Sequence, residues 1–303
     1  MIRVEHLTKR FGDTVAVNDL SFEIRPGAVT GFLGPNGAGK STTMRCIVGL
    51  DRPTSGTALV GGRRYATLKR PAEHVGSILD LKAFHAPRTA RNHLKVMATL
   101  AGVPRKRADE VLELVGLSEV ADVRAGRFSL GMGQRLSLAT ALLGRPNVLI
   151  LDEPLNGLDP EGIHWMRSVI RGHAGGGGTV FVSSHLLSEM AELADDLVVI
   201  GKGALIASGP IGQFISANTT STVRVVSPQL AELMEAFSNV SHAIWTRDKE
   251  AVVVAGIEAR VIGERAASLG IVLHELTPMQ ATLEQAYFDV TRNAVEFGSG
   301  DGT

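Results

Sequence analysis

The sequence predicts an α/β protein with a mostly parallel sheet, followed by a smaller α+β domain. Three observations indicate this fold class. A glycine-rich loop at residues 34–42 lies between a short apolar segment and a helix-like segment. A continuous apolar run at residues 147–151 is typical of a strand buried on both faces of a parallel sheet. After about residue 216, strand-like and helix-like segments follow the order β-α-β-β-α-β-α, which is typical of a split-βαβ domain.

The glycine-rich loop has the spacing G-x-x-x-x-G-K-[ST] of a phosphate-binding loop. Glycines let the backbone fold round a phosphate, and the N-terminus of the following helix adds positive potential. In such a loop Lys40 reaches the β- and γ-phosphates, and the Ser41 hydroxyl binds Mg²⁺. A chance glycine-rich turn before a lysine is the alternative, which the flanking strand and helix disfavour. The expected phosphate-binding residues are Gly34, Pro35, Asn36, Gly37, Ala38, Gly39, Lys40, Ser41 and Thr42.

Composition and charge narrow the class of protein. At 303 residues the chain has the length of about two domains, and 44% hydrophobic with 20% charged residues is typical of a globular protein. The 31 basic residues balance the 31 acidic residues, which disfavours a nucleic-acid partner. Cys46 is the only cysteine, so an intramolecular disulfide is impossible, as fits a reducing cytosol. The sequence shows no signal-peptide pattern and no long apolar run, so we expect the protein to act at a membrane only through a partner protein.

The first half of the chain predicts an antiparallel part, a phosphate-binding part and a helical insert. Residues 2–7 and 20–24 alternate apolar and polar side chains, as half-buried strands do. Further strands are expected at 57–60 and 74–79. A helical pattern then covers the insert at about 81–145, where Thr89 and Ser129 are candidate helix caps and Pro104 begins a further helix. Beyond it we expect a strand at 179–182 and a hairpin at 197–207.

The C-terminal domain is expected at residues 216–303, after an N-terminal domain at 1–215. Strands are predicted at 221–226, 243–246, 251–255 and 271–274. Helices are predicted at 229–237, 258–269 and 279–291.

A second candidate motif follows the apolar run at residues 147–151. Asp152 and Glu153 come directly after this strand, and ligands bind at the carboxyl ends of parallel strands. Asp152 is therefore expected to hold Mg²⁺, and Glu153 to orient or deprotonate an attacking water. The alternative is a pair of acids at a helix start ahead of Pro154.

A third motif, FSLGMGQR at residues 128–135, gives the chain a recognisable resemblance. With the other two motifs in this order, the chain resembles the nucleotide-binding subunit of an ATP-binding cassette (ABC) transporter, over about residues 1–215. The family signature LSGGQ is the variant FSLGM here. The resemblance implies that Ser129, Gly131 and Met132 contact ATP. It also implies a P-loop NTPase core with an antiparallel β subdomain and a helical insert.

The resemblance implies roles for three further residues. Phe11 matches the aromatic residue that stacks on adenine, although a lone aromatic there is more often a loop anchor into the core. The segment NGLD at 156–159 matches the D-loop, which ends at Asp159. His185 matches the switch histidine that contacts the γ-phosphate.

Asp80 marks a departure from the family pattern. The family usually has a glutamine at this position, where it touches Mg²⁺ and the attacking water. An aspartate there can still bind the metal and take part in catalysis, but it adds a negative charge beside the γ-phosphate. This segment resembles that of drug and antibiotic exporters of the bacitracin and daunorubicin type.

The resemblance implies ATP hydrolysis that powers an exporter of a drug, an antibiotic or another amphipathic compound. Two cassettes would pair head to tail, most simply as a homodimer, and dock on a separate transmembrane permease subunit. The protein would then be cytoplasmic and peripheral on the inner face of the cell membrane. The alternative is a soluble ABC ATPase in DNA repair or translation, but such relatives usually have a long coiled coil or two cassettes. A non-hydrolysing binding module is a third class, which the presence of Lys40, Asp152, Glu153 and His185 disfavours.

Overall fold

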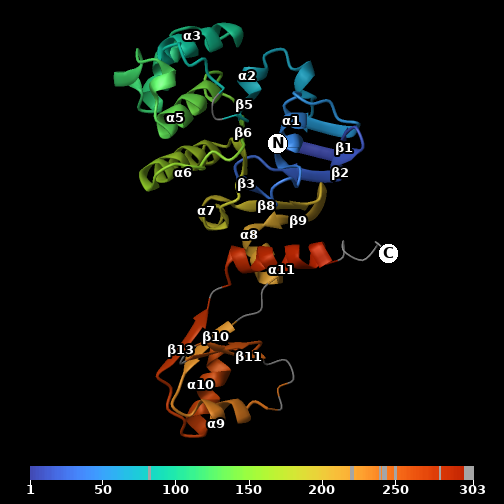
Figure 1. Cartoon of the computed structure of the whole chain (residues 1–303), viewed down its shortest axis with the longest axis vertical. Helices are drawn as coiled ribbons and strands as arrows, with labels where there is room; N and C mark the ends of the chain where they lie inside the picture. The colour runs from blue at the N-terminus through green and yellow to red at the C-terminus, as the bar shows by residue number, and fades with distance from the viewer. Residues whose placement is uncertain are drawn as a thin grey trace. The chain divides into compact units, whose positions relative to one another are not determined.

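The computed structural model describes residues 1–80, 83–218, 222–238, 240, 244–248, 251–279 and 281–296. The chain divides into two compact units, Met1–Ile211 and Gly212–Thr303 (Figure 1). The domain boundary expected after residue 215 lies inside helix α8 (Ile211–Asn218). In the described residues no helix is long and apolar enough to span a bilayer.

The first unit is built on a six-stranded, mostly parallel sheet. Its strand order is β5-β6-β7-β3-β8-β9, and all neighbours are parallel except β8 and β9, which form the expected hairpin. The carboxyl ends of β3, β6 and β7 therefore lie at one edge of the sheet, where ligands bind in folds of this kind. The strands are β3 (Val29–Leu33), β5 (Val75–Ile78), β6 (Val148–Leu151), β7 (Thr179–Ser183), β8 (Asp196–Gly201) and β9 (Ala204–Pro210).

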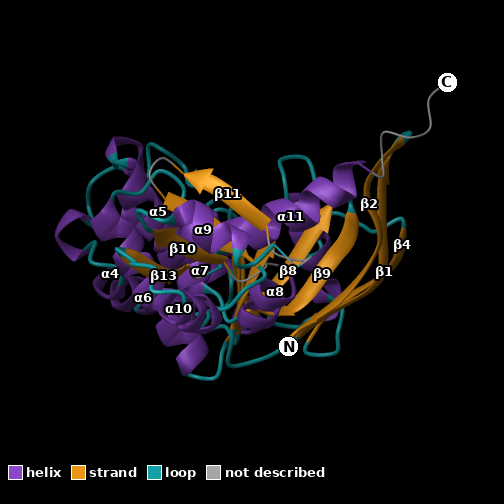
Figure 2. Ribbon diagram, turned by 90° about the horizontal axis from the view of Figure 1, so that it is seen from below, coloured by secondary structure: helices purple, strands orange, loops and turns teal. Residues whose placement is uncertain are grey.

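A three-stranded antiparallel sheet of order β2-β1-β4 forms the expected antiparallel part (Figure 2). Its strands are β1 (Ile2–Phe11), β2 (Thr14–Ile24) and β4 (Ser55–Val60). Strands β1 and β2 are longer than predicted. The alternation of apolar and polar side chains is interrupted where the register of their pairing shifts, so the pattern revealed only part of each strand.

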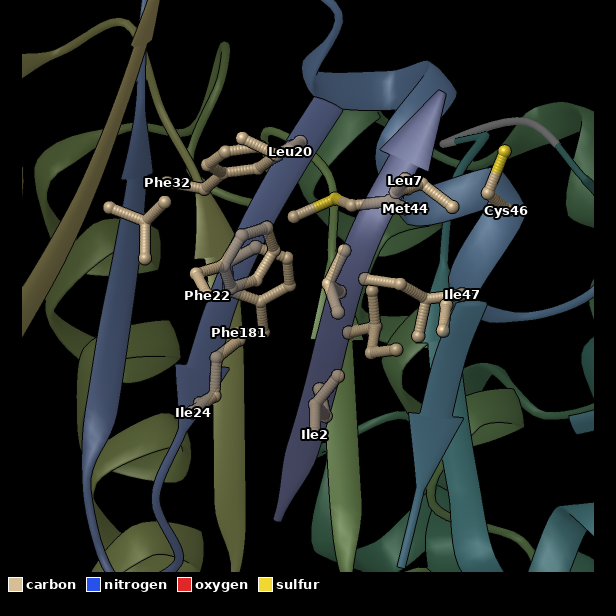
Figure 3. Close-up of a cluster of buried hydrophobic side chains, with 14 of the residues drawn as sticks. Ile2, Leu7, Leu20, Phe22, Ile24, Phe32, Met44, Cys46, Ile47 and Phe181 are labelled. Carbon is tan, nitrogen blue, oxygen red and sulfur yellow. The ribbon is translucent and has the colours of Figure 1, made fainter. Parts of the chain in front are cut away.

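Both sheets and helix α1 (Lys40–Ile47) share one hydrophobic core (Figure 3). The rings of Phe22, Phe32 and Phe181 pack together, with centroid distances between 4.8 and 5.8 Å. Met44 and Ile47 on α1 are buried in the same cluster. This packing fixes the N-terminus of α1, and with it the phosphate-binding loop, at the edge of the parallel sheet.

The helical insert contains α3 (Ala90–Leu100), α4 (Arg107–Leu114) and α5 (Leu130–Ala141), which pack on one another. Thr89 and Ser129 cap α3 and α5 through their side-chain oxygens, as predicted. Helix α4 begins three residues later than expected, because Pro104 lies in a preceding turn in which its carbonyl accepts from Arg107. The other helices of this unit are α2 (Pro71–His74), α6 (Pro160–Gly175) and α7 (Leu187–Leu193), with short 3₁₀ turns at Tyr65–Thr67, Ser118–Val120 and Ala125–Arg127.

The second unit has a four-stranded sheet of order β11-β12-β10-β13, in which all neighbours are antiparallel. This is the strand order of the predicted split-βαβ domain. Its core contains Val223, Val254 and Ile262. The elements are β10 (Thr222–Val226), α9 (Leu230–Glu235), β11 (Ile244–Asp248), β12 (Ala251–Ala255), α10 (Ala259–Ser268), β13 (Glu275–Met279) and α11 (Leu283–Glu296). The strands expected from 221 and 243 would begin at residues outside the described part.

The last predicted strand, at residues 271–274, is wrong: the strand is β13, Glu275–Met279. Ile271 is buried, but its N–H donates to the carbonyl of Ala266 at the end of α10. The carbonyl of Val272 accepts from the Ser227 hydroxyl, so this stretch is not part of a strand ladder. The apolar residues there seal the core, and pairing with β10 begins only at His274, whose N–H donates to the carbonyl of Val226. The helix predicted from residue 279 begins at Leu283, because Met279 still belongs to β13.

Candidate nucleotide-binding site

The phosphate-binding loop joins β3 to α1 through a backbone that only glycine fits at two points. Gly39 has φ +102°, and a Cβ there would lie 2.4 Å from the carbonyl oxygen of Ala16. A Cβ on Gly34 would lie 2.5 Å from the carbonyl oxygen of Ile200. The loop is thus pressed against β2 and β8, and its glycines are required by close backbone approach as well as by φ.

Lys40 points back into this loop. Its ammonium donates to the carbonyl oxygens of Gly34 at 2.7 Å and Pro35 at 3.3 Å, and the residue is only 7% exposed. Burial lowers the pKa of Lys40, while the nearby carboxylates of Glu153 and Asp152 act in the opposite direction. The positive charge is therefore concentrated inside the loop, within reach of the two acids.

A cavity of about 260 Å³ brings the first two sequence motifs together. We call it the Lys40 cavity. Ser41 offers a hydroxyl and Asp152 a carboxylate, and hard oxygen donors of this kind suit Mg²⁺. The donor set therefore fits a Mg²⁺-nucleotide. The cavity is lined by Ala16, Asn36, Gly37, Gly39, Lys40, Ser41, Thr42, Asp152 and Glu153.

Ser183, at the end of β7, links the two acids. Its hydroxyl donates to Oδ1 of Asp152 at 2.5 Å and accepts from the N–H of Glu153 at 2.9 Å. The N–H of Asp152 donates to the carbonyl of Ile78 on β5 at 2.7 Å. The sequence did not single out Ser183 as a site residue. The signal was present, because a polar residue at the carboxyl end of a buried parallel strand lies where ligands bind.

His185 lies beside Glu153. Oε2 of Glu153 is 2.7 Å from Nδ1 of His185, and it also accepts from the backbone N–H of His185 at 3.3 Å. Glu153 has φ +52°, which is rare for a residue with a side chain. The fold therefore brings Lys40, Asp152, Glu153 and His185 to one edge of the parallel sheet.

Ser129 of the signature and Asp159 of the D-loop make hydrogen bonds within their own segments. Ser129 accepts from the N–H of Met132 at 3.2 Å, and Asp159 accepts from the N–H of Gly162 at 2.9 Å, so each caps a helix. Ser129, Gly131, Met132 and Asp159 are not among the described residues that line the Lys40 cavity.

Phe11 and Asp80 also lie outside that lining. Phe11 is 50% exposed at the turn between β1 and β2, with the Lys9 ammonium 4.6 Å from its ring centroid. Asp80 is exposed, two residues after Ile78, whose carbonyl bonds to Asp152.

Comparison with known proteins identifies the family. The ABC transporter family profile matches residues 17–156, and a profile described as a domain of unknown function matches residues 221–284. Bacitracin transport ATP-binding protein BcrA of Bacillus licheniformis is 43% identical over 221 residues, which are 72% of each chain. Lantibiotic transport ATP-binding protein SrtF of Streptococcus pyogenes is 38% identical over 68% of this chain and 89% of its own. The uncharacterized ABC transporter ATP-binding protein YhcH of Bacillus subtilis is 35% identical over 98% of this chain and 97% of its own.

Solved structures give the same fold. An ATP-binding subunit of an ABC transporter matches with a TM-score of 0.66 at 26% identity, covering 72% of this chain and 92% of that one. A dimeric cassette in a post-hydrolysis state, bound to ADP and Pi, matches with a TM-score of 0.63 at 23% identity. The match covers 69% of this chain and 98% of that one. The chain belongs to the ATP-binding proteins of ABC transporters. It is an ATPase subunit that binds and hydrolyses ATP for transport.

Proposed function

We propose that this ATPase drives export of an amphipathic compound, such as a peptide antibiotic, through a separate transmembrane permease. The observation that carries the proposal is the cluster of Lys40, Asp152, Glu153 and His185 at one sheet edge. The subtype is supported by the likeness to the bacitracin and lantibiotic transport proteins. Their function in transport disfavours the alternative of a soluble ATPase in DNA repair or translation.

Lys40 and the loop amides bind the β- and γ-phosphates of ATP in this proposal. The Lys40 ammonium then exchanges the carbonyls of Gly34 and Pro35 for phosphate oxygens. Ser41 and Asp152 hold Mg²⁺, with Asp80 near the same metal. When bound, Mg²⁺ neutralises the charge on the phosphates during transfer. Phe11 lies on the exposed turn where it can stack on the adenine.

Glu153 orients the attacking water and accepts its proton. For this task a carboxylate must be held in one orientation, because general base catalysis depends on geometry before pKa. Ser183 fixes the backbone N–H of Glu153, and His185 fixes its carboxylate. In this proposal His185 also contacts the γ-phosphate.

A second copy of the chain completes each site. Ser129 and Asp159 cap the N-termini of α5 and α6, and helix N-termini attract phosphate. We propose that Ser129, Gly131, Met132 and Asp159 face the ATP bound by the partner's phosphate-binding loop. The cassette pair docks on the permease and is therefore peripheral on the inner face of the cell membrane.

Three variants test the nucleotide site. Lys40→Ala should lose tight ATP binding in a fluorescent-nucleotide titration, because the buried ammonium is gone. Glu153→Gln should bind ATP with unchanged affinity but release no phosphate, since only the base is removed. The exposed Glu161→Gln on α6 is the matched control and should behave as wild type. If Lys40→Ala binds ATP as wild type does, or if Glu153→Gln hydrolyses it at the wild-type rate, the assignment of the site is wrong.

The export proposal has its own test. Cells that produce the chain with its membrane subunit should tolerate a cyclic peptide antibiotic better than cells with the Glu153→Gln chain. Equal tolerance, with ATPase activity intact in the wild type, would remove this substrate class while leaving the ATPase assignment in place.

A further inference from the structure

The segment 156–159, matched above to the D-loop, packs on the first turns of α5 in the same chain. Nε2 of Gln134 donates to the carbonyl oxygen of Asn156 at 2.6 Å. Gln134 is 1% exposed, so this bond is shielded from water. A Cβ built on Gly131 would lie 3.4 Å from Cδ2 of Leu158, which is ordinary van der Waals contact. The D-loop and the signature turn are thus joined within one chain.

The end of the Leu130 side chain lies over Gly157 in this join. Gly157 has φ +71°, and a Cβ there would lie 2.5 Å from Cδ2 of Leu130. Side chains essentially never approach that closely, so a methyl group on residue 157 would turn the exposed end of the leucine side chain away. Leu130 is the residue by which the signature FSLGM departs from LSGGQ at its third position. It is 45% exposed, next to the Ser129 cap.

The positive φ of Gly157 does not explain this contact. Gly102, between α3 and α4, has φ +69° and no atom within 4 Å of its ideal Cβ position. The two glycines therefore have nearly the same φ but differ in their surroundings. The comparison separates backbone strain from the clash with Leu130.

We propose that Leu130 and Gly157 interlock, so that the signature turn and the D-loop form one unit that positions Ser129 and Asp159 against the partner's ATP. This inference rests on the proposed function. Leu130 and Gly157 are positioning residues: they act on hydrolysis through the two helix caps. Nucleotide binding by the chain's own phosphate-binding loop does not depend on them, since neither lines the Lys40 cavity within the described residues.

The experiment is a double-mutant cycle on the full chain, with ATPase rate and nucleotide affinity measured for each variant. Gly157→Ala should lower kcat about tenfold or more, because small displacements of positioning groups have large effects on rate. Its KM for ATP should stay within about twofold of wild type, as expected when only an interaction of the transition state is lost. Leu130→Ala alone, which keeps its Cβ on the signature turn, should lower kcat less than Gly157→Ala does. Adding Leu130→Ala to Gly157→Ala should therefore raise kcat to nearly the value of Leu130→Ala alone. Gly102→Ala, which carries the backbone strain without the clash, should keep the wild-type kcat.

Several results would overturn the interlock. The proposal is wrong if Gly157→Ala has the wild-type kcat, or if the double variant has a kcat as low as that of Gly157→Ala. It is also wrong if Gly102→Ala lowers kcat as much as Gly157→Ala does. If Gly157→Ala does not fold, Leu130→Gly tests the same contact, because it removes the leucine from an exposed position. It should lower kcat with unchanged KM, and unaltered kcat would contradict the proposal.

Hydrogen exchange distinguishes failure of the interlock from failure of the proposed function. The amides of residues 156–159 should exchange faster in Leu130→Gly whether or not the site assignments for ATP hydrolysis are correct. Unchanged exchange there would reject the interlock by itself. If exchange is faster but the wild-type chain does not hydrolyse ATP, the interlock stands and the proposed function is wrong.

Discussion

The carboxylate of Glu153 is bound twice by His185, through the ring Nδ1 at 2.7 Å and through the backbone N–H at 3.3 Å. A carboxylate at neutral pH only accepts, so Nδ1 carries the proton in this contact. Glu153 has a left-handed backbone, a strained conformation that persists only where neighbours enforce it. His185 thus fixes the orientation of the carboxylate, while the Ser183 hydroxyl holds the backbone N–H of Glu153.

Removing the His185 side chain should therefore slow hydrolysis more than it weakens binding. We expect His185→Ala to lower kcat by about 10²-fold, in the range for loss of a group that positions a general base, with ATP affinity little changed. Phosphate release and fluorescent-nucleotide titration measure the two quantities. The control is His164→Ala, at an exposed position on α6. A His185→Ala chain with the wild-type turnover number would mean that Glu153 needs no such support.

Asp80 should influence the metal requirement. It follows Ile78, whose carbonyl accepts from the N–H of Asp152 at 2.7 Å, so the two acidic segments are joined. Asp80→Gln removes a negative charge near the proposed Mg²⁺ site. We expect the Mg²⁺ concentration for half-maximal ATPase activity, the maximal rate, or both to change. Glu73→Gln, on the exposed surface of α2, is the control. Identical Mg²⁺ titrations of Asp80→Gln and wild type would place Asp80 outside the site.

His93 should make the first unit less stable in acid. It is 4% exposed, and burial lowers its pKa from 6.5 to about 4, with a smaller contribution from Arg88. The unfolded chain therefore takes up a proton before the folded chain does. The free energy of unfolding is therefore unaffected by this group above pH 6.5 and decreases as the pH falls toward 4. The decrease reaches up to about 3 kcal/mol, at 1.4 kcal/mol per pKa unit.

Urea unfolding at pH 7, 6 and 5 tests this expectation. His93→Gln should flatten the pH dependence, whereas the exposed His164→Gln should keep it. Trp245→Phe in every variant leaves Trp165 to report on the first unit, since the chain has 2 tryptophans. If His93→Gln and wild type lose stability in parallel, His93 is not the titrating group.

Shared sites predict complementation between inactive chains. Lys40→Ala homodimers lack both phosphate-binding loops, and Ser129→Arg homodimers lack both signature turns. A mixed dimer of the two has one doubly defective site and one intact site. An equimolar mixture should therefore regain ATPase activity, measured by phosphate release with the membrane subunit present. No recovery from a mixture shown to form mixed dimers would mean that each chain uses its own signature.

The sequence predicted those parts of the fold that depend on local pattern. The strand expected at 179–182 and the caps at Thr89 and Ser129 match the structure, because burial on both faces and helix capping leave local signals. The strand at 275–279 was missed because it contains Pro278, which a ladder accepts only at a sheet edge, where β13 lies.

The site was predictable where motif spacing carries it, as for Lys40 and Asp152. It was not predictable where two distant segments meet. The hydroxyl of Ser183 joins Asp152 to Glu153 only because β6 and β7 are neighbours in the sheet. Likewise, nothing in FSLGM or NGLD alone indicates that Leu130 lies against Gly157.

The chain has a separate hydrophobic core in each unit, one formed by residues between Ile2 and Ile200 and the other by residues between Val223 and Ile271. Calorimetry of the full chain should therefore resolve two melting transitions, and no single melting temperature describes the protein. A nucleotide that binds the folded first unit raises only the transition of that unit, by mass action. A thermal-shift screen for inhibitors must follow that transition alone, because a dye signal averaged over both would understate every compound that occupies the Lys40 cavity.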